Sequence, residues 1–178
     1  MAPSSSQEVA VLLPLAVFVA AMLTTIVVHA IALAAVVDFV RREHRLGRAG
    51  VRFWRDVGIV AGAALVAIVA HLAEITLWAV VLDSCGEFTR LAAAFYHSAM
   101  NFTSLGYGDV IMSASWKLLG PLEAANGMLM FGISTAMIFA AIQRLVRPRF
   151  SDAEIASTPS AGRAGTVFRL LNRQPGDP

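Results

Sequence analysis

The chain of 178 residues is long enough for one domain or for one subunit of a larger assembly. Hydrophobic residues make up 57% of it and charged residues 15%, against about 45–50% and about 25% in ordinary soluble domains, which excludes a soluble globular enzyme. The single cysteine excludes an intrachain disulfide framework and any cysteine-based metal site, and a net charge of +2 gives no argument for nucleic acid as a partner.

The first apolar run extends from Val9 to Val37 and contains no formally charged residue. A helix needs about 20 residues to cross a bilayer, so this run is long enough. A cleaved signal peptide is the alternative, but it has a basic start and a core of only about 7–15 residues. The first 40 residues contain no Lys or Arg. We therefore predict an extracellular N-terminus at 1–8 and a retained transmembrane helix at 9–40.

Two further apolar runs follow. The run at 57–82 is interrupted only by His71 and Glu74, and the run at 118–145 has Glu123 near its start. Both are long enough to span. The mixed-polarity stretch between them contains a shorter segment, 90–102, whose length indicates a re-entrant or interfacial helix.

Basic residues gather on one side of this plan. Two clusters contain Arg41, Arg42, Arg45, Arg48, Arg52 and Arg55 in the loop 41–56, and Arg144, Arg147, Arg149, Arg163, Arg169 and Arg173 around the tail 146–178. Basic loops stay in the cytoplasm, so we predict a multi-pass protein of the plasma or bacterial inner membrane with its N-terminus outside and its C-terminus inside. Anionic lipid headgroups are expected partners of both clusters. From Pro148 onward the composition predicts a flexible tail with a short surface helix around Val167–Arg173.

The most informative stretch is 95–109, Phe-Tyr-His-Ser-Ala-Met-Asn-Phe-Thr-Ser-Leu-Gly-Tyr-Gly-Asp. A short helix is predicted to end near Phe102, and two glycines then flank a tyrosine. Glycines allow backbone carbonyls to turn in directions that other residues disfavour. Non-helical backbone at membrane depth is tolerated only in a protein interior or along a water-filled cavity. A row of carbonyls in such a place suits a cation that sheds its water.

The segment 103–109, Thr-Ser-Leu-Gly-Tyr-Gly-Asp, resembles the selectivity filter of potassium channels, usually Thr-Val-Gly-Tyr-Gly-Asp. The order of outer helix, pore helix, filter and inner helix over 57–145 is also similar to that family. The resemblance implies an all-α membrane protein with three transmembrane helices, a re-entrant pore helix and a filter loop. Four such loops surround one pore, so it implies a homotetramer. It further implies a passive potassium channel, not an enzyme, with no cofactor other than the potassium ions in the filter.

The roles implied by the resemblance fall on named positions. The filter would consist of Thr103, Ser104, Leu105, Gly106, Tyr107, Gly108 and Asp109, with K⁺ bound at Ser104, Leu105, Gly106 and Tyr107. Asp109 at the outer mouth would raise the local cation concentration. The pore helix would aim the partial negative charge of its carboxyl end at the central cavity.

Four positions depart from the family's pattern. Ser104 occupies the position of the usual threonine. Leu105 occupies the position of a β-branched residue, and a β-branched residue would stiffen the chain more than leucine does. A non-selective monovalent cation channel is therefore an alternative, and an accessory subunit of a membrane transporter is another. His97 supports the filter if it bonds Tyr107, which would make the outer filter sensitive to pH. Met100 stands where some members have a glutamate, so carboxylate support behind the filter is expected to be absent.

The inner helix offers further candidates. Gly127 and Gly132 are hinge candidates, with close helix packing as the alternative, which we favour for Gly132. Ser134 and Thr135 are candidates for lining the cavity. No arginines are spaced along a span, so a voltage sensor is not expected and the gating stimulus stays open.

His71 and Glu74 are three residues apart and share a helix face. We expect a hydrogen-bonded pair that locks the second span to the first span or to the pore helix, with proton sensing as the alternative. His29 is expected to make a helix–helix or interfacial contact. The four histidines are scattered in the sequence, so no metal site is expected, and Cys85 is expected to be free.

Overall fold

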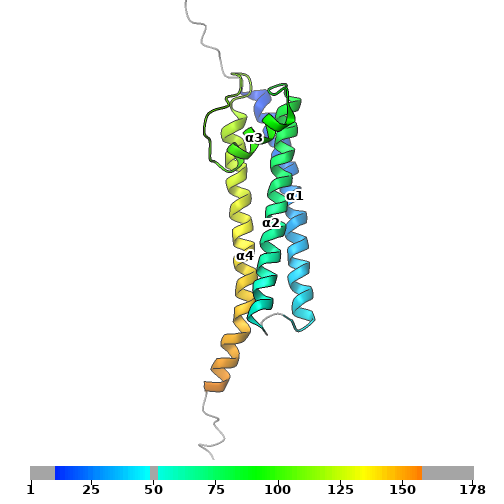
Figure 1. Cartoon of the computed structure of the whole chain (residues 1–178), viewed down its shortest axis with the longest axis vertical. Coiled ribbons are helices and arrows are strands. Elements are labelled where there is room, and N and C mark those ends of the chain that lie inside the picture. Colours follow the sequence, from blue (N-terminus) through cyan, green and yellow to red (C-terminus); the bar gives the residue numbers. More distant parts are fainter. Residues whose placement is uncertain (1–10, 49–51, 158–178) are drawn as a thin grey trace, which may run out of the picture.

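The computed structural model describes residues 11–48 and 52–157, and this part of the chain is helical without strands. It contains α1 (Leu12–Arg45), α2 (Phe53–Ser84), α3 (Leu91–Phe102) and α4 (Leu119–Ser157) (Figure 1). The N-terminus predicted at 1–8 and the short helix predicted around Val167–Arg173 lie outside the described residues.

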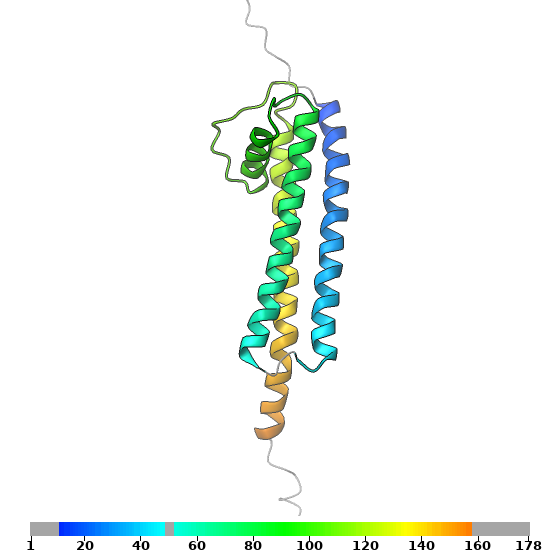
Figure 2. The same ribbon diagram turned by 45° about the vertical axis from the view of Figure 1, so that its right-hand side comes forward.

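Three helices are long and apolar enough to cross a membrane, namely α1, α2 and the part of α4 up to Leu145. They run side by side along the long axis, and α3 lies at one end beside α2 and α4, away from α1 (Figure 2). The amino end of α1 and the amino end of α4 lie at the same end as α3 (Figure 1). The predicted all-α membrane class with three spanning helices is confirmed.

The long helices extend beyond the predicted spans on the basic side. α1 ends at Arg45 and α2 begins at Phe53, so the loop predicted at 41–56 is largely helical at both ends. α4 continues through Pro148 to Ser157, so the tail predicted from 146 begins as a continuation of this helix. Arginine and glutamate are good helix formers, so a charge that marks the edge of the membrane does not mark the end of a helix.

Two apolar clusters hold the helices together, one toward each end of the bundle. The cluster near α3 includes Trp78, Leu82, Phe102, Leu119 and Met130. The cluster near the basic end includes Val36, Val40, Ile59, Ala63, Ala141 and Leu145. By their positions along α1, α2 and α4, several buried polar side chains lie between the two clusters. The outward faces carry large exposed hydrophobic residues, as expected for contact with lipid or with other subunits.

Truncation of Leu82, which is fully buried, is predicted to destabilise the bundle by about 2 kcal/mol or more, because the cavity would not close completely. Leu82→Ala should lower the thermal unfolding midpoint in detergent. The matched control is Leu65→Ala on the same helix, where the side chain is 62% exposed, and a change within about 0.5 kcal/mol is expected. Equal effects of the two substitutions would contradict the packing described here.

Candidate functional site

The segment that follows α3 has a backbone of alternating handedness. Ser104, Gly106 and Gly108 have φ values of 59°, 51° and 73°, and they are the only described residues between 103 and 109 with positive φ. In an ordinary extended strand successive residues point to opposite sides. A positive φ at every second residue instead allows successive backbone carbonyl groups to point to the same side of the loop. A positive φ is unfavourable for serine, so Ser104 carries local strain that the surrounding structure must offset.

This loop is attached to the carboxyl end of α3. The Met100 carbonyl accepts hydrogen bonds from the amides of Leu105 and Gly106 at 2.9 and 3.1 Å. The Thr103 hydroxyl donates to the Ala99 carbonyl at 2.7 Å. These bonds use carbonyl groups that the end of a helix leaves without partners. Met100 thus supports the loop through its backbone, and the orientation of α3 determines that of the loop.

All seven residues from 103 to 109 are exposed in the single chain. Leu105 is 52% exposed and Tyr107 is 70% exposed, which is unusual for large apolar and aromatic side chains at one site. The structure therefore brings the predicted filter residues together in one loop but leaves them uncovered by their own chain.

Asp109 is held by a residue that the sequence analysis did not select. The Tyr96 hydroxyl donates a hydrogen bond to Asp109 Oδ2 at 2.9 Å. This bond, followed by desolvation and by repulsion from the carboxylate, raises the pKa of Tyr96, so the phenol remains a donor. The only signal in the sequence was a phenol on the short helix that leads to the filter, next to His97.

His97 faces the protein rather than Tyr107 of its own chain. It is buried, its ring lies 5.2 Å from that of Phe88, and its Nε2 has no hydrogen-bond partner among the described residues. Burial lowers the pKa of His97 because it disfavours the charged form, against smaller opposing effects from Asp109 and the backbone of Val110. The expected bond to Tyr107 is not made within one chain.

A carboxyl group lies behind α3, although it comes from α4 and not from position 100. Glu123 of α4 is fully buried, and its Oε1 meets the Ser98 hydroxyl at 2.5 Å. Asn101 Nδ2 donates to Glu123 Oε2 at 3.4 Å, and the Ser98 hydroxyl also lies 2.9 Å from the Ile75 carbonyl. The sequence analysis missed this role because the carboxyl comes from α4 and not from the segment that precedes the filter.

Gly127 allows α4 to touch the end of α3. A Cβ atom placed on Gly127 would lie 2.0 Å from the Phe102 carbonyl oxygen, which no side chain tolerates. The close-packing alternative for Gly127 is therefore confirmed, whereas no atom lies within 4 Å of a Cβ placed on Gly132. The packing that we favoured for Gly132 thus finds no partner within the described residues. The hinge role of either glycine stays a prediction.

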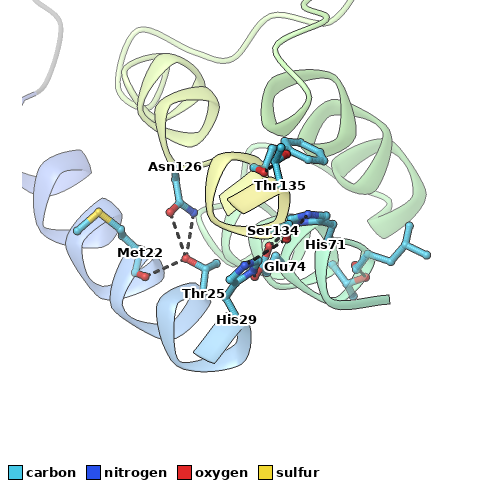
Figure 3. A network of polar contacts seen from close by, with 11 residues as sticks. Met22, Thr25, His29, His71, Glu74, Asn126, Ser134 and Thr135 are labelled. Carbon is cyan, nitrogen blue, oxygen red and sulfur yellow. Dashed lines mark hydrogen bonds and ion pairs between the residues drawn. The ribbon is translucent and has the colours of Figure 1, made fainter. Parts of the chain in front are cut away.

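The prediction that Ser134 lines a cavity is wrong. Its side chain is 5% exposed, and its hydroxyl lies 3.3 Å from His29 Nε2 and 3.2 Å from His71 Nε2 (Figure 3). Thr135 is exposed and its hydroxyl donates to the Phe131 carbonyl at 2.8 Å, so it stays a candidate. Adjacent residues of a helix point about 100° apart, which separates these two neighbours.

His29 of α1 and the pair His71 and Glu74 of α2 form one polar cluster. Glu74 Oε1 lies 2.9 Å from His29 Nδ1, and Glu74 Oε2 lies 3.1 Å from His71 Nδ1. The expectation that this pair locks the second span to the first is confirmed. Although the histidines are scattered in the sequence, the fold brings two of them together, and His29, His71 and Glu74 offer ligand atoms that all lie within 4.8 Å of one another.

Residues 59–144 match a protein-family model described as an ion channel. The matched region includes α3, the loop at 103–109 and most of α2 and α4, and α1 lies outside it. No solved structure matches the chain. The matched region supports an ion channel, and the three helices that are long and apolar enough to cross a membrane suggest a multi-pass membrane protein.

Replacement of Gly127 by alanine is predicted to displace α3 from α4, because the added methyl group would overlap the Phe102 carbonyl. Overpacking of this kind costs about 1–3 kcal/mol. Gly127→Ala should therefore lower the unfolding midpoint in detergent. Gly132→Ala, where a methyl group meets no atom within 4 Å, is the matched control and should be neutral or stabilising. A Gly127→Ala protein as stable as this control would show that the close approach is absent.

Acidification is predicted to destabilise the region around His97. Its pKa lies below the ordinary value of 6.5, so the unfolded chain binds more protons and stability is lost as the pH falls below that value. The thermal midpoint of the wild type should drop between about pH 8 and about pH 5 by more than that of His97→Gln. An identical drop in both proteins would contradict a burial cost at His97.

Proposed function

We propose that the chain forms a passive, K⁺-selective channel whose filter is the loop 103–109. The observation that carries the proposal is the alternating backbone at Ser104, Gly106 and Gly108, in a loop attached to a short helix between two spanning helices. Carbonyls of residues 104–107 would replace the water around a dehydrated potassium ion. The α3 helix would be re-entrant and would direct the partial negative charge of its carboxyl end toward the cavity.

A homotetramer follows from the incompleteness of the loop. One loop cannot surround an ion, and a potassium filter consists of four. The exposed Leu105, Tyr107 and Ile111 would then be covered by neighbouring subunits. His97 Nε2, which has no partner among the described residues of its own chain, would be available to the Tyr107 hydroxyl of a neighbour. Thr135 would face the cavity, whereas Ser134 would not.

The supporting contacts explain how the filter would keep its shape. Tyr96 holds Asp109 at the end of the loop, where its charge would attract cations. Glu123 and Gly127 fix α3 against α4, and Met100 fixes the start of the loop against α3. A rigid carbonyl row favours a cation of one size and hydration, although field strength also contributes.

The membrane orientation is part of the proposal. The end of the bundle with α3 and the filter would face outward, and the basic ends of α1 and α4 would face the cytoplasm. Arginines such as Arg42 and Arg45, which lie in the last turn of α1, would then meet anionic headgroups.

A non-selective cation channel is the second candidate. Leu105 replaces the usual β-branched residue, so the middle of the filter has more torsional freedom. The same pore would then conduct sodium as well as potassium.

The test is ion flux into liposomes that contain the purified chain, measured separately for K⁺ and Na⁺. We expect K⁺ flux with little Na⁺ flux, and a decrease to background in Gly106→Asp, because a side chain at φ 51° would distort the filter. The matched control is Gly47→Asp, which has a φ of 62° in the loop after α1 and should leave flux unchanged.

Three results would count against the proposal in different ways. Equal K⁺ and Na⁺ flux that is lost in Gly106→Asp would establish the non-selective channel. Flux that persists in Gly106→Asp would remove the loop from the pathway. A particle mass in detergent that does not correspond to four subunits would contradict the homotetramer.

A further inference from the structure

The buried polar cluster of His29, His71, Glu74 and Ser134 is not used by the proposed ion pathway. These side chains are 3%, 7%, 0% and 5% exposed, and they come from α1, α2 and α4 (Figure 3). They lie between the two apolar clusters, in the part of the bundle that would cross the membrane. Polar groups at that depth are costly and are retained where they have a task.

Hydrogen-bond counting indicates that the cluster needs one positive charge, supplied either by a proton on a histidine or by a bound cation. Ionised Glu74 accepts one Nδ1 proton from His29 and one from His71 if both imidazoles are neutral. Both Nε2 atoms then present lone pairs to the Ser134 hydroxyl, which has a single proton for the two contacts. One contact is left without hydrogen and one negative charge is left without a counterion. Either deficit is costly in a buried site.

The donor atoms match a transition metal. Two imidazole nitrogens and one carboxylate oxygen form a known zinc ligand set with an open fourth position. Zinc bonds of about 2.0–2.2 Å place neighbouring tetrahedral ligands about 3.3 Å apart. The separations of 2.9 Å between His29 Nδ1 and Glu74 Oε1 and of 3.1 Å between His71 Nδ1 and Glu74 Oε2 are within a few tenths of an ångström of that spacing. One ligand atom from each of the three residues lies within 4.8 Å of the others, so a bound metal would draw them closer together.

Ser134 matches the second requirement of such a site. A histidine that binds a metal through one nitrogen normally donates its other N–H to a nearby acceptor, which fixes the ring. With the metal at the two Nδ1 atoms, both Nε2–H groups would donate to the lone pairs of the Ser134 oxygen. The contact that lacks hydrogen in the metal-free cluster would then be satisfied.

We propose that His29, His71 and Glu74 bind a divalent transition metal ion of the zinc type, and that Ser134 orients both histidines. Glu74 balances one of the two positive charges. The fourth position would be open to a water molecule, which zinc would make more acidic.

The site gives α1 a specific attachment to the rest of the chain. α1 lies outside the region that matches the ion-channel family, and many of its large apolar side chains are exposed. The metal would join His29 of α1 to α2, and Ser134 would extend the connection to α4. This inference is independent of conduction.

The test measures metal binding by the full chain in detergent, without flux. The protein is stripped with a chelator, incubated with Zn²⁺, desalted and analysed for bound zinc. We expect one zinc per subunit and a raised unfolding midpoint with zinc, since a ligand that binds only the folded state stabilises it. Co²⁺ should give the visible absorption of a tetrahedral site.

Variants separate ligands from neighbours. His71→Gln and Glu74→Gln should abolish the cobalt spectrum. Ser134→Ala keeps all three ligands and should weaken zinc affinity by about 10–100-fold. His44→Gln, an exposed histidine on α1, is the matched control and should bind normally.

Each opposite result overturns the proposal. Absence of bound zinc in the folded wild type would do so whether or not the variants fold. Zinc that remains in His71→Gln with unchanged affinity would place the metal elsewhere. If no metal binds and the stability of the wild type depends on pH in a way that Glu74→Gln removes, the missing positive charge is a proton.

Discussion

The position of α3 depends on one buried hydroxyl. Ser98 lies between the Ile75 carbonyl of α2 and the Glu123 carboxyl of α4, and all three groups are removed from water. A polar group without a partner in this setting costs free energy, so the three helices can meet in few other ways. Gly127 tightens the same junction by direct contact with the Phe102 backbone. The filter loop begins where this junction ends, and its geometry therefore depends on contacts made behind it.

The bundle has polar contacts in layers, and each layer joins a different set of helices. The layer at Ser98 joins α2, α3 and α4, and the deeper layer at Glu74 joins α1, α2 and α4. Apolar packing has little preference between a helix neighbour and a lipid chain. Buried hydrogen bonds have that preference, because lipid offers no donor or acceptor. The polar layers therefore give the helices specific rotations that the apolar surfaces alone would not.

Much of the fold could be predicted because the membrane imposes simple lengths. Runs of about 20 apolar residues predict spans, and the shorter segment that ends at Phe102 predicts a helix that does not cross. The glycines at 106 and 108 predicted an unusual backbone, which the positive φ values confirm. The end of α4 was placed too early because Pro148 and the nearby charges resemble a boundary, whereas the helix continues to Ser157.

The amino-acid sequence by itself determined the number of spanning helices, the place of the short helix and the loop that resembles a potassium filter. Only the tertiary structure decided which residues support that loop and which polar groups meet in the core. His29 and Ser134 are 105 positions apart, and their contact depends on how α1 and α4 are rotated about their axes. A span that is apolar on all faces gives no periodic signal of that rotation, since lipid and protein both accept the same side chains. For this reason Ser134 was assigned to a cavity, Glu123 was overlooked, and the histidines were judged to be separate.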